Sequence, residues 1–311
     1  LRSLVGSEMC IRDRSNYTHA MLKELGIPSV YTVISTDNER LLPDFSSVDQ
    51  MNHAILQVPL PEDTLWLECT NPQLPFGYVH SSIAGHDALL ITKEGGIMCR
   101  LPSYPDSLNT QTTNASVTLT PTGGAKIKAS EISHLFQYES TAGITRLEPS
   151  HRKDYLRSGI NLIQANINNI QINEAKEVIP MIDIQYTVET EQYGNKTGNR
   201  LFIPANIFRK GFTTPDLKQR VQDIHINYGY LDTDSICLQI PEGYTIESLP
   251  KTCQVTSSFG SFSSSLMIKD KEICIIHRLL MHRGIYPKDV YKDFLEFRKQ
   301  IAAQYSSKII L

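Results

Sequence analysis

Hydrophobic and polar positions alternate along much of the chain, and this pattern predicts strands more often than helices. Residues 29–36 are rich in β-branched side chains, and residues 53–58 and 64–70 form two further strands joined by a short Pro-containing segment. Residues 88–102 predict a strand, a Gly-Gly turn and a second strand. The remaining predicted strands all lie in the second half of the chain or just before it: 115–132 (a hairpin turning at Gly123-Gly124), 180–190, 199–204, 223–230, 235–241 and 272–280.

Two segments have clear helical periodicity. In residues 15–29, Tyr17, Met21 and Leu25 recur at helical spacing, and Gly26 is the natural residue to end the helix. The last helix begins after Pro287, and its apolar stripe consists of Val290, Phe294, Phe297, Ile301 and Tyr305. A short helix is also predicted at 149–157, and the final "KIIL" reads as a strand.

Segments without periodicity and segments rich in loop-forming residues indicate the domain boundaries of the chain. The first fourteen residues, "LRSLVGSEMCIRDR", show no periodicity that continues into the helix from Ser15, so we expect residues 1–14 to be non-native or disordered and the native chain to extend upstream. Residues 104–113 are rich in Pro, Ser, Thr and Asn and predict a linker. The remaining residues divide into a first domain at 15–103 and a β-rich domain at 114–311.

Composition and charge exclude some classes of partner. The chain has 311 residues, of which 41% are hydrophobic and 20% charged, with a formal net charge of −3. No block of Lys and Arg is long enough to follow a phosphate backbone, which argues against nucleic acid as a partner. No apolar run is long enough to span a membrane, and these residues contain no signal peptide.

The cysteines and histidines give no metal or cofactor signature. None of the six cysteines forms a CxxC pair or a zinc-type cluster with histidine. Cys237 and Cys274 fall on predicted strands and could pair, although free buried thiols are the favoured interpretation, and the state of Cys253 stays open. His80 and His86 could suggest a metal site with His53, but no carboxylate joins them at ligand spacing. We therefore interpret His80 and His86 as solvated loop residues. The sequence therefore predicts neither a metal nor a cofactor.

One pair of residues has a spacing that suggests chemistry. Alternation puts His53, Ile55 and Gln57 on one face of their strand, and Trp66 and Glu68 on one face of the next. A register with Gln57 opposite Thr64 sets His53 opposite Glu68, close enough for the carboxylate to hold the imidazole. A histidine held in this way can activate a nucleophile, which we expect on the helix from Ser15. From spacing alone, a hydrogen-bonded surface pair is the commoner explanation.

A family resemblance adds to this hypothesis. The "SNYT" helix, "GIPS", "DFSSVDQMNHAILQVP", "LWLECTNP" and "PFGY" together resemble the second half of a bacterial transglutaminase-like domain. "GNRLFIP", "DTDSICLQIPEGYTIESLP" and the final "KIIL" are similar to the C-terminal β domain, of unknown function, in one subfamily. The resemblance implies an α+β fold: an incomplete papain-like or transglutaminase-like half-domain, followed by a β-sandwich-like domain with a C-terminal helix.

The resemblance also implies roles for particular residues. His53 falls on the family's histidine, the general base, and Glu68 replaces the family's aspartate as the residue that orients it. The family's nucleophilic cysteine falls on Ile11. Cys10 is one residue early and lacks the Gly-Asp context, and one residue on a helix is a rotation of about 100°. The catalytic role is therefore not carried over to Cys10, and we predict that this chain is inactive.

The resemblance implies that the intact parent performs cysteine-based acyl transfer or amide hydrolysis on a protein or peptide substrate, in the periplasm or at the cell surface. Gln50, Asn52 and Trp66 are tentative substrate contacts, and shaping of the loop or packing in the core explains them equally well. Cys69 and Cys99 are not assigned as nucleophiles, because Cys69 points to the face away from Glu68 and Cys99 has no histidine nearby in the sequence. The alternative function is a non-catalytic binding or structural module at the cell envelope.

Overall fold

The structure is a computed structural model of the whole chain. It describes all residues except 1, 46, 212–214 and 218–219, and it does not describe the side chains of residues 2–11. The chain divides into two compact units. Unit 1 comprises Leu1–Tyr104 and Ala175–Met181, and unit 2 comprises Pro105–Glu174 and Ile182–Leu311.

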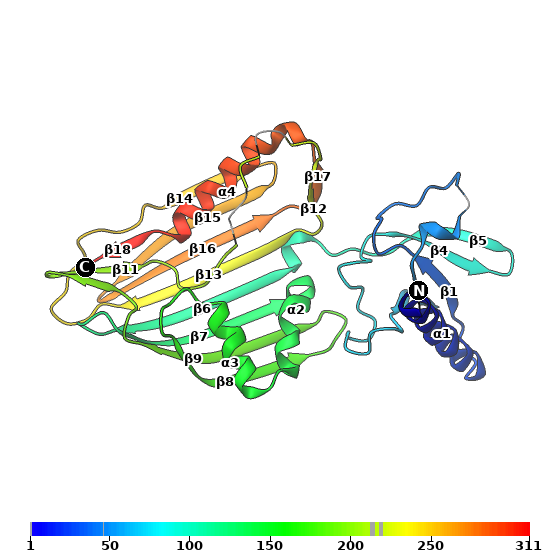
Figure 1. Cartoon of the computed structure of the whole chain (residues 1–311), viewed down its shortest axis with the longest axis horizontal. Helices are drawn as coiled ribbons and strands as arrows, with labels where there is room; N and C mark the ends of the chain where they lie inside the picture. Colours follow the sequence, from blue (N-terminus) through cyan, green and yellow to red (C-terminus); the bar gives the residue numbers. More distant parts are fainter. Residues whose placement is uncertain (1, 46, 212–214, 218–219) are drawn as a thin grey trace. The chain divides into compact units, whose positions relative to one another are not determined.

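Unit 1 combines one long helix, α1 (Arg2–Glu24), with a five-stranded antiparallel sheet of order β3-β2-β1-β4-β5. The five strands are β1 (Val30–Ile34), β2 (His53–Pro59), β3 (Thr64–Leu67), β4 (Asp87–Thr92) and β5 (Gly95–Arg100). A 3-10 helix, η1 (Val48–Gln50), precedes β2. In Figure 1, α1 lies beside β1.

Helix α1 differs from the expected helix at its beginning. It begins at Arg2 and therefore includes residues 2–14, the segment expected to be non-native or disordered. It ends as predicted, because Gly26 has a positive φ of 72° and its N–H donates to the carbonyl of Lys23. The predicted stripe of Tyr17, Met21 and Leu25 is exposed. Ser15 is fully buried instead, and its hydroxyl donates to the carbonyl of Ala54 at 2.9 Å.

The core of unit 1 lies in the central strands and in the loop between β3 and β4. Ile34, Ile55 and Leu56 are at most 1% exposed, and Tyr78 and Ile83 from the loop are equally well buried. Each such side chain contributes about 1.5–3 kcal/mol through burial. The loop is therefore held as firmly as the strands, which fixes the residues that come after Tyr78.

Unit 2 is built on one eight-stranded mixed sheet of order β14-β15-β16-β13-β6-β7-β9-β8 (Figure 1). Strands β13 and β6 are parallel, whereas β13–β16, β15–β16, β14–β15 and β6–β7 are antiparallel. The strands are β6 (Thr110–Leu119), β7 (Ala125–His134), β8 (Asn166–Ala175), β9 (Met181–Thr190), β13 (Tyr230–Gln239), β14 (Cys253–Ser257), β15 (Gly260–Lys269) and β16 (Glu272–Met281).

In the described residues of unit 2, two smaller sheets and three α-helices accompany the large sheet. The small sheets are β10 (Asn195–Thr197), β11 (Arg200–Pro204) and β18 (Lys308–Ile310), and β12 (Ile224–Ile226) with β17 (Gly284–Tyr286). The helices are α2 (Leu135–Thr141), α3 (Pro149–Ser158) and α4 (Tyr291–Tyr305), and short 3-10 turns are η2 (Asp106–Leu108), η3 (Ala142–Arg146) and η4 (Lys288–Val290).

The helices of unit 2 cover two separate hydrophobic cores. Tyr138 of α2 and Leu156 of α3 pack with strands β6 to β9 and with β11 and β18. Phe297 and Ile301 of α4 pack against β15 and β16, including Phe262. Figure 1 shows α4 running along that part of the sheet. The predicted C-terminal helix and final strand are therefore confirmed.

The predicted fold class is wrong. The described chain is mostly β, with large mixed and antiparallel sheets, and it does not form a clear α+β papain-like half-domain. The β-rich second part is present, but its main feature is one eight-stranded sheet, and not two large sheets packed face to face. The predicted linker already contains η2 and the start of β6 at Thr110. Among the described residues, no helix is long and apolar enough to cross a membrane.

Candidate functional site

His53 is the first residue of β2, where it lies opposite Ile34 of β1. The preceding residue is held in place by its backbone, because the N–H of Asn52 donates to the carbonyl of Ile34 at 3.2 Å. The His53 side chain is only 9% exposed. The strand pairing thus fixes the imidazole at the edge of the core of unit 1.

Glu68 comes directly after β3 and contacts His53. Nε2 of His53 lies 2.6 Å from Oε2 of Glu68, and the carboxylate side chain is 4% exposed. The predicted contact is therefore present, but the predicted register is wrong. Gln57 lies opposite Trp66, two residues further along β3 than expected. A shift of two residues keeps every side chain on the same face, which is why the pair still meets.

His80 joins this pair from the loop between β3 and β4. Its Nε2 lies 3.2 Å from the same Oε2 of Glu68, and its side chain is 13% exposed. Its other ring nitrogen, Nδ1, lies 2.8 Å from the hydroxyl of Ser82. The rings of His53 and His80 are nearly perpendicular, with centroids 6.4 Å apart. The interpretation of His80 as a solvated loop residue is wrong.

The second oxygen of the Glu68 carboxylate is held by the backbone. Oε1 accepts hydrogen bonds from the N–H of Thr70 at 2.7 Å and from the Thr70 hydroxyl. Burial alone would raise the pKa of Glu68, but the hydrogen bonds from His53, His80 and Thr70 outweigh it and hold that pKa well below its usual range. Glu68 is therefore a fixed carboxylate anion at neutral pH.

Only one nitrogen of His53 is used by these contacts. Within the part of the chain whose side chains are described, Nδ1 of His53 makes no hydrogen bond. With a proton on Nε2, as the contact with the carboxylate favours, Nδ1 carries a lone pair. The imidazole can therefore accept a proton at Nδ1 while Glu68 stabilises the positive charge.

The tentative substrate residues have other partners. Gln50 accepts from the N–H of Leu42 at 2.7 Å and donates to the Phe45 carbonyl, which closes the loop before η1. Asn52 accepts from the N–H of Thr36 at 2.8 Å. Trp66 is 7% exposed in the core. These contacts account for the three side chains by loop shaping and packing.

No thiol that the structure describes contacts His53. Cys69 is half-buried beside Ser15 and Thr18 of α1, with its Sγ 3.6 Å from the Leu67 carbonyl, and burial raises its pKa. Burial also raises the pKa of Cys99. The side chain of Cys10 lies outside the described part of the chain. The helix expected to carry the nucleophile contacts the Ala54 backbone through Ser15 and the Thr70 backbone through Arg14, whereas the partner of the His53–Glu68 pair is His80.

The sequence analysis expected no metal-ligand cluster because no carboxylate was expected beside the histidines. The structure overturns this reason, since the Glu68 carboxylate contacts both His53 and His80. One ligand atom each from His53, Glu68 and His80 lie within 4.8 Å of one another. His86 does not take part, because it is buried and its Nδ1 lies 2.8 Å from the Ser35 carbonyl. No sequence pattern predicted the contact of His80 with Glu68, since the position of His80 depends on the path of a loop.

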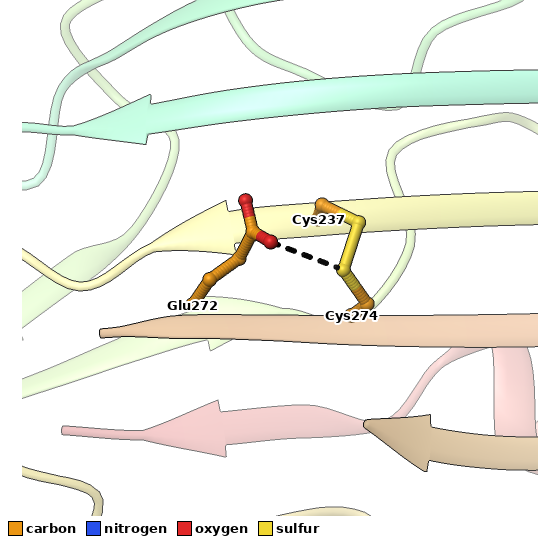
Figure 2. The surroundings of a disulfide bond; sticks show 3 residues. All are labelled: Cys237, Glu272 and Cys274. Carbon is orange, nitrogen blue, oxygen red and sulfur yellow. Dashed lines mark hydrogen bonds between the residues drawn. A yellow bond between two sulfur atoms is a disulfide. The ribbon is translucent and has the colours of Figure 1, made fainter. Parts of the chain in front are cut away.

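A disulfide bond joins Cys237 of β13 to Cys274 of β16, so the preference for free thiols at these positions is wrong. The two residues lie directly opposite each other in the antiparallel pair (Figure 2). Glu272 Oε2 lies 3.7 Å from the Cys274 sulfur. This is a contact and not a hydrogen bond, because a disulfide sulfur carries no proton. Cys253 remains a free thiol.

Unit 2 also contains a buried charged cluster that sequence reasoning missed. Nζ of Lys210 lies 3.0 Å from Oδ1 of Asp234 and 3.4 Å from Oδ2 of Asp232. Asp234 also accepts hydrogen bonds from Thr113 and Tyr305. Burial by itself lowers the pKa of Lys210, but the two aspartates outweigh it and hold that pKa above its usual value. Lys210 is therefore a buried cation.

Comparison with known proteins identifies part of unit 2. A family described as a domain of unknown function with solved structure, DUF3858, matches residues 199–311. This region contains "NRLFIP", "DTDSICLQIPEGYTIESLP" and "KIIL", the stretches that carried the resemblance to a C-terminal domain of unknown function. No curated protein matches the chain.

Several solved structures match the chain. One is a "putative protease" from Parabacteroides distasonis, with 8% sequence identity and a TM-score of 0.48. The match covers 95% of this chain and 42% of that protein, so this chain spans less than half of its length.

Proposed function

We propose that His53 and Glu68 are the general base and the orienting carboxylate of a transglutaminase-like site for acyl transfer or amide hydrolysis. The observation that carries this proposal is the 2.6 Å contact between Nε2 of His53 and Oε2 of Glu68, with Nδ1 of His53 left free among the described side chains. The same division of the two ring nitrogens is what a nucleophile-activating histidine needs.

The chemistry assigned to this pair is proton transfer. Nδ1 of His53 takes the proton of a thiol as the thiolate attacks the carbonyl of a protein or peptide amide. The resulting imidazolium is stabilised by Glu68, and it returns the proton to the leaving amine as the acyl-enzyme forms. Water or a second amine then completes hydrolysis or transfer.

The nucleophile is not among the thiols that the structure describes. Raised pKa values disfavour the thiolate of Cys69 and of Cys99. We therefore expect no cysteine-dependent amidase activity from the chain as it stands. The family resemblance puts the missing thiol at the position of Ile11.

The test restores that thiol. In a Cys10→Ser background, Ile11→Cys is expected to give one cysteine that iodoacetamide alkylates rapidly at pH 7, with an apparent pKa below that of a free thiol. Adding His53→Ala is expected to slow the labelling of Cys at position 11 by at least about 10-fold, because the general base is lost. Labelling is followed by peptide mass spectrometry.

His151→Ala, at an exposed position of α3, is the matched histidine control and should leave the rate unchanged. Slow labelling of the new thiol, or a rate that is the same with and without His53, would contradict the proposal. That result would favour the alternative, a non-catalytic binding or structural module, which is also consistent with the lack of contact between the described thiols and His53.

We also propose that the chain works in an oxidising, extracytoplasmic compartment. The disulfide between Cys237 and Cys274 supports this, because disulfides persist in the periplasm and at the cell surface and are rare in the cytosol. Alkylation of the protein directly on cell lysis should find Cys237 and Cys274 protected and Cys253 modified. Modification of all three would count against this location.

A further inference from the structure

We propose that His53, Glu68 and His80 together bind one divalent transition-metal ion of the zinc class. The proposal does not rest on the acyl-transfer chemistry above, because it concerns equilibrium binding and needs no thiol. It uses two of the same side chains and adds His80, for which the acyl-transfer proposal has no role.

The three side chains offer a suitable set of donor atoms at one point. Two imidazole nitrogens and one carboxylate oxygen are a recurring set for zinc, in which three protein ligands leave a fourth position open. Here Nε2 of His53 and Nε2 of His80 both approach the same oxygen, Oε2 of Glu68, at 2.6 Å and 3.2 Å. All three donor atoms lie within 4.8 Å of one another.

These separations are close to those of a metal centre. With bonds of about 2.0 Å and tetrahedral angles, the ligand atoms of a zinc site lie about 3.3 Å apart. The distance between His80 and Glu68 already has this value, and the distance between His53 and Glu68 needs to lengthen by less than about 1 Å.

The surroundings of His80 and Glu68 hold these two residues in position. Metal-binding histidines usually donate their other N–H to a neighbouring group, and metal-binding carboxylates are hydrogen-bonded in turn. Nδ1 of His80 has the hydroxyl of Ser82 at 2.8 Å, and this hydroxyl can accept from Nδ1 once a metal occupies Nε2. Oε1 of Glu68 is held by the N–H of Thr70 at 2.7 Å, which leaves Oε2 for the ion.

Burial and charge favour an ion at this point. The three side chains are between 4% and 13% exposed, so a bound ion would be largely shielded from water while an open coordination position remains. One carboxylate and two neutral imidazoles give a formal charge of −1, which a divalent cation turns to +1. Two nitrogen ligands select zinc, copper or nickel over magnesium and calcium, which prefer oxygen.

Metal binding and the base role of His53 exclude each other. A metal ion on Nε2 of His53 displaces the proton that this nitrogen shares with Glu68. The same three residues therefore have two states: a metal-free state in which Glu68 orients His53, and a metal-bound state in which His53 cannot act as the proposed base. Zinc would accordingly inhibit any reaction that uses His53.

The test is direct titration of the untagged 311-residue chain, stripped with a chelator. Isothermal titration calorimetry with Zn²⁺ should show one site per chain, and Co²⁺ should give the visible absorption bands of a four-coordinate ion. His80→Gln and Glu68→Gln should each weaken this site by at least about 100-fold, beyond the effect usual for residues that only support a ligand. Mg²⁺ and Ca²⁺ should not compete.

Further variants keep the test decisive if a ligand variant folds poorly. Ser82→Ala removes only the partner of His80 and should weaken zinc binding about 10-fold or more. His151→Ala and His225→Ala, both at exposed positions of unit 2, should leave the site unchanged. No stoichiometric zinc site, or a site of equal affinity in wild type, His80→Gln and Ser82→Ala, would overturn the proposal. Neither result bears on the alkylation test of the acyl-transfer site.

Discussion

Glu68 lies 2.6 Å from His53, and this contact joins β2 to the segment after β3. The carboxylate is almost completely buried, so the charge is stable only because hydrogen bonds compensate for the loss of water. The contact thus contributes to the stability of unit 1, whatever its chemical role.

The first prediction concerns acid stability of the metal-free protein. The folded-state pKa of Glu68 lies below its ordinary value of 4.5, so its contribution is present above that pH and is lost as the pH falls through the folded-state pKa. In Glu68→Gln this acid-dependent loss should be absent, and at pH 7 the variant should be less stable by about 2 kcal/mol. Urea unfolding followed by the fluorescence of Trp66, the single tryptophan, reports on unit 1.

Glu94→Gln is the control for this experiment, because Glu94 is exposed in the same unit. It should reproduce the wild-type curve. A Glu68→Gln variant with the same acid profile as wild type would show that the carboxylate is not held as an anion.

The alternation of side chains was enough to predict the His53–Glu68 contact but not its surroundings. Successive residues of a strand point to opposite faces, so an error of two residues in register leaves each residue on its predicted face. The contact was therefore predicted although Gln57 lies opposite Trp66 and not opposite Thr64. His80 could not be predicted in the same way, because it comes from a loop with no periodicity. The alternation also predicted most of the strands, but the α+β class followed from the resemblance of the first domain, and the large sheets make the chain mostly β.

The second prediction concerns the disulfide bond. Cys237 and Cys274 are 37 residues apart in sequence, and closing a loop of that length stabilises the folded state by roughly 3–4 kcal/mol. The Cys237→Ser, Cys274→Ser double variant should lose about this much in urea unfolding of unit 2, followed by circular dichroism. Wild type with the bond reduced should behave in the same way.

Cys253→Ser is the matched control, since this cysteine is free and half-buried in the same unit. It should change the unfolding free energy by less than about 1 kcal/mol. Equal stability of the double variant and wild type would mean that the bond does not form in solution. The sequence analysis named this pair but favoured free thiols, because cysteine spacing does not reveal which strands are neighbours.

The third prediction concerns two buried groups of unit 2 with opposite pH dependence. Burial, together with the charge of Asp234, raises the pKa of Asp232 to about 6 despite the opposing effect of Lys210. The contribution of Asp232 to stability is therefore present below its unfolded-state pKa and is lost as the pH rises through about 6. Burial lowers the pKa of His277 to about 4, so its contribution is present above pH 6.5 and is lost as the pH falls toward 4.

Between pH 4 and 6 the two contributions oppose each other, and the unfolding free energy of wild type should change little. In Asp232→Asn the contribution of His277 remains, so the free energy of unfolding should fall by roughly 3 kcal/mol as the pH falls from 6 to 4. In His277→Gln the contribution of Asp232 remains, so the free energy of unfolding should fall by a similar amount as the pH rises from 4 to 6. Urea unfolding at several pH values measures the slopes. Slopes of the same sign in both variants would contradict this assignment.

The sequence does contain a signal for this buried cluster. Buried and less buried residues alternate along β13, and Asp232 and Asp234 lie on the same buried face of the strand as Ile236 and Leu238. An acidic residue at an inward position needs a buried partner. What the sequence could not identify is that partner, because Lys210 comes from an irregular segment before β12.

The last prediction therefore tests that partner. Lys210→Met removes the cation but keeps the apolar stem, and leaves Asp234 as an uncompensated buried charge. The free energy of unfolding at pH 7 should fall by about 3–5 kcal/mol. Lys126→Met, at a site where the Lys126 side chain is 79% exposed beside Glu189, should cost less than about 1 kcal/mol.

Adding Asp234→Asn to Lys210→Met should recover part of the loss, because the charge of Asp234 is removed together with its partner. If the double variant is instead destabilised by the sum of the two single changes, then Lys210 and Asp234 do not stabilise each other.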